Sequence, residues 1–280
     1  MKIPGNGKVI KNVAELMKWK LSAAVTFSSV TGYFLCHGSS PGELSTVVAG
    51  VFLLASGAAA MNQYTEIKSD ALMERTMGRP LPTGKMEPRK GLMIASILIL
   101  TGSIVLSLNG VLPLVLGLLN VVLYNVIYTG LKKKTTLAII PGALVGAIPP
   151  LIGYASAGGI ITDPGILLFA LFMFLWQLPH FWLLLIRYGK EYEKAGIKTI
   201  YNSLNGKQIS RLVFFWIAGS SLLLWILNGI LLPFKLPATL TMMGLNIAFI
   251  VLFFRVIYSP VKEKWSNNPF ILINTFSLLI

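Results

Sequence analysis

The chain has 280 residues, of which 55% are hydrophobic and 12% are charged, and its formal net charge is +14. A soluble domain carries about 25% charged residues, so the composition excludes an ordinary soluble protein and indicates an integral membrane protein. The single cysteine, Cys36, excludes an intrachain disulfide and argues against a cysteine-based metal site.

Apolar segments long enough to cross a bilayer, which takes about 17–25 residues, recur along the chain. We expect an all-α bundle of about nine transmembrane helices around a central cavity that opens to the cytoplasmic side. The predicted spans are 19–37, 43–62, 91–108, 111–130, 136–158, 164–187, 209–230 and 236–257, and a ninth that starts at Phe270 and is short or cut off. Residues 1–18 then form a basic N-terminal segment, and residues 19–280 form a single transmembrane domain.

Positive charge is confined to alternate segments between these spans. All but one of the 24 Lys and Arg residues lie in the N-terminal segment or after the second, fourth, sixth and eighth spans, and the exception is Lys235. The positive-inside rule therefore predicts that the N-terminus and the polar segments face the cytoplasm. Since the charge follows membrane topology, we exclude a nucleic-acid partner.

The most polar segment, residues 61–90, follows the second span. Asn62, Glu66 and Asp70 recur there every four residues, so on a helix one amide and two carboxylates share a face at the membrane edge. The basic residues that follow are Arg75, Arg79, Lys85, Arg89 and Lys90. Magnesium takes one or two carboxylates together with substrate phosphate, and arginine binds the same phosphate oxygens. The pattern predicts a site for magnesium and a phosphorylated ligand; the alternative is a solvated loop with surface ion pairs.

Two later regions add polar groups on the same side. Lys132, Lys133 and Lys134 end the fourth span, where they suit either phosphate binding or the fixing of orientation against anionic lipid. Glycines and prolines between residues 140 and 150 suit either close helix packing or the wall of a large-ligand cavity. After the sixth span we expect a second mixed-charge loop, residues 187–199, that closes the same site from another direction.

The sixth span contains His180 beside Gln177, Trp176 and Trp182. A histidine inside a membrane helix is costly and often functional. The alternative is a hydrogen-bonded core residue without a ligand.

Together these motifs resemble the UbiA-type intramembrane prenyltransferases. Asn-x3-Glu-x3-Asp followed by Arg75-Thr-x-x-Arg79-Pro-Leu-Pro-x-Gly84 is similar to the first signature of that superfamily. Within it, the chain resembles the protohaem IX farnesyltransferase (haem O synthase) family. The further matching segments are Tyr128-Thr129 with the lysine tract, Pro149-Pro150-Leu-Ile-Gly153, Trp176-Gln-x-Pro-His180-Phe-Trp182 and Glu191-Tyr-x-x-Ala-Gly-Ile197.

The resemblance implies transfer of a farnesyl group from farnesyl diphosphate to a vinyl group of haem b, with addition of water, giving haem O for terminal oxidase biogenesis. It implies a bacterial-type plasma (inner) membrane, and magnesium on Asn62, Glu66 and Asp70, which form the catalytic set with Arg75 and Arg79. The residues matched to diphosphate binding are Arg75, Arg79, Lys85, Lys132, Lys133, Lys134, Arg187, Lys190, Glu191 and Lys198. Those matched to haem are His180, Gln177 and Trp176. Beyond the substrates and the lipid bilayer, the partners to expect are haem A synthase or oxidase assembly proteins.

The chain departs from the superfamily at two places. The second motif usually carries two aspartates four residues apart, but here Glu191 is the matching acid and Arg187 and Tyr188 stand where another acid is expected. This leaves the number of magnesium ions open and makes the nearby cations candidates for neutralising phosphate. The first span begins Leu16-Met-Lys-Trp-Lys-Leu21, where many members have Lys-Pro-Arg.

Three other functions fit parts of the sequence. A prenyltransferase for a quinone precursor or another aromatic acceptor would use the same scaffold. A secondary transporter tends to place its polar residues near the membrane midplane, whereas the acids here cluster at the cytoplasmic edge. A structural assembly factor for a respiratory oxidase would not need aligned carboxylates.

Overall fold

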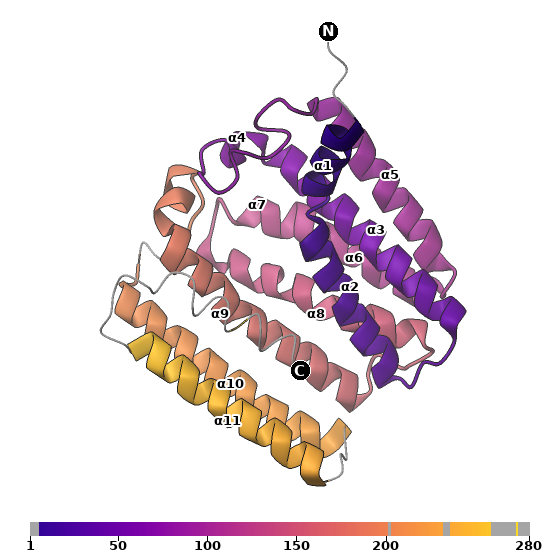
Figure 1. The fold of residues 1–280 in the computed structure, drawn as a ribbon, viewed down its shortest axis with the longest axis vertical. Helices are drawn as coiled ribbons and strands as arrows, with labels where there is room; N and C mark the ends of the chain where they lie inside the picture. The colour runs from indigo at the N-terminus through magenta and orange to yellow at the C-terminus, as the bar shows by residue number, and fades with distance from the viewer. Residues whose placement is uncertain (1–5, 201–202, 232–235, 259–272, 274–280) are drawn as a thin grey trace.

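The computed structural model describes residues 6–200, 203–231, 236–258 and 273, and in these ranges the secondary structure is helical (Figure 1). The helices are α1 (Asn6–Leu16), α2 (Trp19–Leu35), α3 (Pro41–Thr65), α4 (Ile67–Asp70), α5 (Pro88–Ser107), α6 (Val111–Val122), the π-helix η1 (Leu123–Tyr128), α7 (Thr129–Leu131), the 3-10 helix η2 (Thr136–Ala138), α8 (Ile139–Ser156), α9 (Pro164–Lys194), α10 (Gly206–Leu231) and α11 (Leu236–Tyr258).

Within the described ranges, six helical segments are long and apolar enough to cross a membrane: Pro41–Thr65, Pro88–Ser107, Val111–Leu131, Thr136–Ser156, Pro164–Leu185 and Gly206–Leu227. α2 and α11, which are not among these six, lie where the first and eighth spans are expected. The prediction of an all-α, multi-pass membrane bundle is therefore confirmed. The ninth span, expected from Phe270, lies outside the described residues except for Ile273.

Small residues let two pairs of helices approach closely. Any side chain on Gly153 of α8 would collide with the backbone carbonyl of Ser29 in α2, and one on Gly32 with that of Pro150. In the same way, a Cβ on Gly57 of α3 would lie 2.7 Å from the side chain of Ile99 in α5. At Pro150, close packing of α2 on α8 fits one of the two roles expected for the glycines and prolines between residues 140 and 150, and Gly153 extends the same contact.

The fourth span changes its helical geometry before it ends. α6 passes at Leu123 into η1, a π-helix that runs to Tyr128, and α7 follows. π-helical turns are rare and occur frequently at functional sites. Here the wider turn stacks the rings of Tyr124 and Tyr128, with centroids 5.9 Å apart and planes 10° apart.

α9 is longer than the predicted sixth span. Residues 187–194 were expected to form part of a loop, but they continue the helix to Lys194. The helix ends there, and two residues later Gly196 has a φ of 70°, in the left-handed region that favours glycine. The amide of Ile197 donates to the carbonyl of Tyr192 over 2.9 Å, which is the closing bond of a Schellman motif. The loop prediction was therefore wrong for residues 187–194. The apolar segment ends there, but the glycine that terminates the helix, Gly196, lies more than two turns further along the chain.

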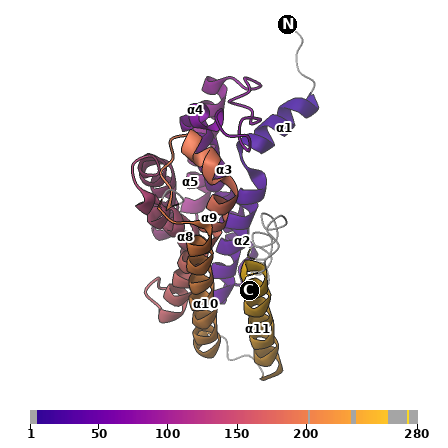
Figure 2. The same cartoon turned by 90° about the vertical axis from the view of Figure 1, so that its left-hand side faces the viewer.

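The polar ends of several helices gather at one end of the bundle. In Figure 1, α1, α4, α7 and the C-terminal end of α9 lie at the same end as the N-terminus. α10 and α11 run side by side as a pair along α9, as the turned view in Figure 2 also shows. A core of aromatic and aliphatic side chains, including Trp176, Phe249 and Phe253, joins this pair to α9.

Candidate active site

Asn62, Glu66 and Asp70 lie together in the interior, at the point where α3 ends. Their exposed fractions are 2%, 5% and 1%. α3 formally ends at Thr65, yet helical hydrogen bonds continue from Glu66 N to Asn62 O (3.0 Å) and from Asp70 N to Glu66 O (2.8 Å). The four-residue spacing therefore does place these groups one above another. Their burial excludes the alternative of a solvated loop.

Each carboxylate is paired with a cation from a different part of the chain. Arg79 Nη1 donates to Asp70 Oδ2 over 2.6 Å, and Lys132 forms an ion pair with Glu66 Oε1. The Lys132 side chain is 11% exposed, and burial lowers its pKa while Glu66 opposes that shift. Because an unpaired buried charge is costly, each of these buried carboxylates has a cation beside it.

Lys18 is a third cation in the same place, and it was not among the residues predicted from the sequence. Its ammonium donates to Asn62 Oδ1 over 3.0 Å and to the Tyr124 hydroxyl over 3.4 Å. Burial, followed by the positive charges of Arg79 and Lys132, lowers the pKa of Lys18 to about 7. The one signal for it in the sequence is its position at the start of the first span, where other family members carry Lys-Pro-Arg.

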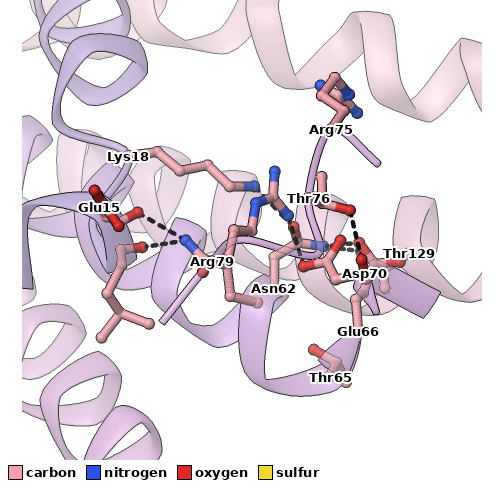
Figure 3. A network of polar contacts seen from close by, with 12 residues as sticks. Glu15, Lys18, Asn62, Thr65, Glu66, Asp70, Arg75, Thr76, Arg79 and Thr129 are labelled. Atoms are coloured by element: carbon pink, nitrogen blue, oxygen red, sulfur yellow. Dashed lines mark hydrogen bonds and ion pairs between the residues drawn. The ribbon is translucent and has the colours of Figure 1, made fainter. Parts of the chain in front are cut away.

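Arg75 does not join this cluster. Figure 3 shows Lys18 and Arg79 reaching toward Asn62 and Asp70, whereas Arg75 points away. Residues 71–87 form consecutive turns rather than a helix, so the four-residue spacing of Arg75 and Arg79 does not put them on one face. Of the two arginines expected in the catalytic set, Arg79 therefore lies at the carboxylates and Arg75 does not.

Arg75 instead connects the first polar segment to the end of α9. Its guanidinium donates to the Tyr192 hydroxyl over 3.1 Å and lies over the Tyr188 ring at 5.2 Å, while its backbone amide donates to Glu191 Oε2 over 3.2 Å. A second link runs from the Lys198 amide to the Lys132 carbonyl over 2.9 Å. The polar segment 61–90 and the segment 187–199, which we expected to close the same site, therefore contact each other.

The remaining predicted cations are exposed. They are Lys85, Lys133, Lys134, Arg187, Lys190 and Lys198. The lysine tract is thus divided: Lys132 is turned inward and the next two lysines are turned outward. Lys132 suits phosphate binding, whereas Lys133 and Lys134 suit the fixing of orientation against anionic lipid. A diphosphate-binding role for the exposed residues stays a prediction.

A row of aromatic rings leads from the carboxylates toward His180. The Tyr124 hydroxyl donates to Asn62 Oδ1 over 3.1 Å, and its ring stacks on Tyr128. Tyr128 then contacts Phe181 with centroids 6.0 Å apart, and Phe181 contacts His180 at 6.3 Å. The row therefore connects the polar cluster to the histidine motif of α9.

Glycines of α8 make room for this row. A Cβ on Gly142 would lie 3.0 Å from the Tyr128 ring, and one on Gly146 would lie 2.5 Å from the Gln177 amide nitrogen. Gln177 therefore faces α8, on the same side of α9 as Phe181. Trp176 instead packs in the core at 3% exposure, 5.9 Å from both Phe172 and Phe249. Its position favours packing over the haem contact expected for it.

The oxygen donors suit magnesium. Two carboxylates and the amide oxygen of Asn62 are hard ligands, and magnesium is commonly held by one or two carboxylates with substrate phosphate completing the shell. In the described part of the chain, no three His, Cys, Asp or Glu residues group closely enough to hold a metal ion. A magnesium ion here would therefore depend on oxygens from a ligand, and the three surrounding cations favour an anionic one.

Comparison with other sequences gives a consistent result. The UbiA prenyltransferase family matches residues 25–277. A Protoheme IX farnesyltransferase of Geobacter sulfurreducens is 41% identical over 182 residues, covering 65% of this chain and 67% of the relative. One of Bacillus cereus is 31% identical over 271 residues, covering 94% of this chain and 87% of the relative.

Solved structures share the fold. A UbiA homolog from Archaeoglobus fulgidus bound to GPP and Mg2+ matches with a TM-score of 0.76 at 13% identity, covering 96% of this chain and 95% of that one. The apo structure of a UbiA homolog from Aeropyrum pernix K1 matches with a TM-score of 0.71 at 19% identity, covering 93% and 98%. With this family match and this fold, the chain belongs to the UbiA prenyltransferase family and is a membrane-embedded prenyltransferase.

Proposed function

We propose that the protein transfers the farnesyl group of farnesyl diphosphate to a vinyl group of haem b and so makes haem O. One observation carries the proposal: relatives named Protoheme IX farnesyltransferase are 31–41% identical to this chain over 65–94% of its length. The geometry supports it, because a buried carboxylate and cation cluster stands at one end of an aromatic row and His180 stands at the other.

In this proposal the diphosphate head group binds at the polar cluster. Magnesium bound at Asn62, Glu66 and Asp70 would neutralise charge on the leaving diphosphate. Arg79 and Lys132 lie at the same carboxylates, where they stabilise the negative charge that develops as the bond between carbon 1 and oxygen breaks. Burial of the cluster excludes bulk water, which strengthens each of these interactions.

The aromatic row faces the allylic cation that this cleavage leaves. Tyr128 lies next to Lys132, whose ammonium is 5.3 Å from the ring centroid, so the ring is close to where the carbon–oxygen bond breaks. The vinyl group of haem b then donates its electron pair to carbon 1 of the farnesyl cation. Water captures the resulting cation beside the macrocycle and releases a proton, which gives a hydroxyethylfarnesyl group.

His180 and Gln177 are the proposed contacts for haem. Both lie on α9, and Gln177 packs against Gly146 of α8. His180 would ligate the haem iron and orient the macrocycle without itself reacting. The partners we propose beyond the substrates are haem A synthase or oxidase assembly proteins, which would receive the product.

The charge distribution supports a membrane orientation. We propose that residues 1–18 and the polar cluster face the cytoplasm of a bacterial-type plasma membrane, with residues 19–280 as one catalytic domain. The support is the confinement of Lys and Arg to alternate segments. Farnesyl diphosphate, which is charged and water-exposed at its head group, would then reach the site from the cytoplasm.

Replacing Tyr128 tests the aromatic row. We expect Tyr128→Leu to lower kcat about thirtyfold without weakening farnesyl diphosphate binding, because a desolvated cation–π contact contributes about 2 kcal/mol. Tyr128→Phe, which keeps the ring, should stay within about threefold of the wild type. Single-turnover kinetics with haem b measure the effect, and Phe27→Leu on the exposed surface of α2 is the control. Full activity of Tyr128→Leu would contradict the cation contact.

Product analysis tests the function itself. Purified protein in detergent is incubated with haem b, farnesyl diphosphate and Mg2+, and the pigment is examined by mass spectrometry with and without a chelator. We expect a haem heavier by one farnesyl group and one water, lost when the chelator is present. Prenylation of an aromatic acid in place of haem would keep the polar cluster as the site but overturn the acceptor, and would return His180 to a core role.

A further inference from the structure

Lys18 is a partly buried basic residue that forms no ion pair with a carboxylate in the described part of the chain. Its two hydrogen bonds go to neutral groups, the amide oxygen of Asn62 and the hydroxyl of Tyr124. In the described part of the chain, the nearby carboxylates of Glu66 and Asp70 form ion pairs with Lys132 and Arg79 instead. Burying an ammonium without an opposite charge is costly, so this arrangement needs a reason.

The backbone at Lys18 adds a second cost. Its φ of 46° and ψ of 48° are in the left-handed region, which is unfavourable for a lysine and favours glycine. Such conformations persist only where the surrounding structure enforces them, and they cluster at functional sites. Met17 and Lys18 join α1 to α2, and the left-handed backbone of Lys18 lies in this turn, where its side chain reaches Asn62.

Two buried side chains enforce the turn. The amide of Gln63, which is fully buried next to Asn62 in α3, donates to the carbonyls of Glu15 and Leu16 over 2.9 Å each. The hydroxyl of Ser22 donates to the carbonyl of Met17 over 2.9 Å. The end of α1 is therefore tied to the same helix that carries the predicted metal ligands, and Lys18 is held against them.

The basic side chains of the cluster outnumber its carboxylates. Lys18, Arg79 and Lys132 lie around the two carboxylates of Glu66 and Asp70. A ligand with several anionic oxygens would supply the missing charge, and a phosphate oxygen forms a strong charge-assisted bond with an ammonium. The flexible four-carbon stem of lysine allows the ammonium to leave Asn62 Oδ1 for such a ligand.

We propose that Lys18 is a catalytic residue that binds the diphosphate of the prenyl donor and stabilises it as it leaves. The inference rests on the proposed function and adds to it a cation from the start of the first span, outside the segments that carry the prenyltransferase signature. When the ammonium moves to phosphate, Asn62 Oδ1 keeps the hydrogen bond from the Tyr124 hydroxyl and gains one free lone pair for another ligand.

Direct binding tests this role independently of turnover. Isothermal titration calorimetry of the full-length protein in detergent, with inorganic pyrophosphate and Mg2+, gives the affinity. We expect Lys18→Met to weaken binding tenfold or more, a loss of about 1.4 kcal/mol or more, and Lys18→Arg to stay within about threefold of the wild type. Lys20→Met is the matched control, because Lys20 is exposed, lies two residues away and loses the same charge.

Lys18→Gly separates charge from backbone strain. Glycine tolerates the left-handed turn, so this variant should unfold at a temperature no lower than the wild type and still lose tenfold or more in pyrophosphate affinity. Pyrophosphate binding by Lys18→Gly or Lys18→Met as tight as that of the wild type would show that Lys18 is structural and overturn the proposal. A loss in Lys18→Arg as large as in Lys18→Met would also overturn it. If the wild type does not bind pyrophosphate with Mg2+, the proposed function fails and the role of Lys18 fails with it.

Discussion

Asp70→Asn should reduce prenyl transfer at least about a hundredfold while leaving the protein folded and inserted in the membrane. The substitution keeps the size of the side chain and an oxygen that can still accept from Arg79 Nη1, 2.6 Å away in the wild type. It removes a negative charge that the proposed magnesium site requires. Preorganised groups at a developing charge are each worth about two to three orders of magnitude in kcat, so the catalytic loss should far exceed the structural one.

The measurement is haem O formation as a function of Mg2+ concentration, with the unfolding temperature recorded for each variant. We expect the residual activity of Asp70→Asn to require more Mg2+ than the wild type. Glu74→Gln is the matched control: this carboxylate is exposed four residues further along, and its loss should change activity by less than about twofold. Asp70→Asn with turnover near the wild-type rate would remove the metal assignment.

Lys132→Met should have the second large effect, on both stability and activity. It leaves Glu66, whose side chain is 7% exposed, as a buried carboxylate without its cation. Breaking a buried ion pair in this way costs about 3–5 kcal/mol. It also removes a cation proposed to stabilise the leaving diphosphate, so we expect a loss of about a hundredfold or more in kcat.

The double variant Glu66→Gln with Lys132→Met separates the two effects. With both charges removed, most of the lost stability should return, because replacing both members of a buried pair is often close to neutral. Activity should not return, because the proposed metal ligand and the phosphate contact are both missing. Chemical denaturation in detergent and the haem O assay measure the two quantities, and Lys68→Met, an exposed lysine between the two carboxylates, is the control. Recovery of activity in the double variant would mean that the pair is only structural.

Features that depend on neighbouring residues were predictable from the sequence. A bilayer requires each crossing helix to be long and apolar, so the described spans lie close to their predicted positions. The stacking of Asn62, Glu66 and Asp70 also followed from their spacing, because helical hydrogen bonds continue past the end of α3. The end of α9 was misplaced because its apolar stretch and its helix end at different residues.

Only the tertiary structure decided which side chains complete the cluster. Lys18 lies 44 residues before Asn62 in the sequence and reaches it because Gln63 ties the end of α1 to α3. Arg79 faces Asp70 and Arg75 faces α9, since the turns between them do not preserve helical spacing. The contacts of Lys18 with Asn62 and of Arg75 with Tyr192 join segments that are distant along the chain.

The same holds for the aromatic row and for α9. The π-helix that stacks Tyr124 on Tyr128 carries no sequence pattern that we recognised, and Trp176 and Gln177 were assigned together although they face different neighbours. By itself, the sequence determined that this is an integral membrane protein, where its spans lie and that Asn62, Glu66 and Asp70 share one helix face. It could do so because composition and periodicity are properties of consecutive residues. Tertiary contacts decided the cation set, the aromatic row and the separation of core from candidate site, because those depend on which distant surfaces meet.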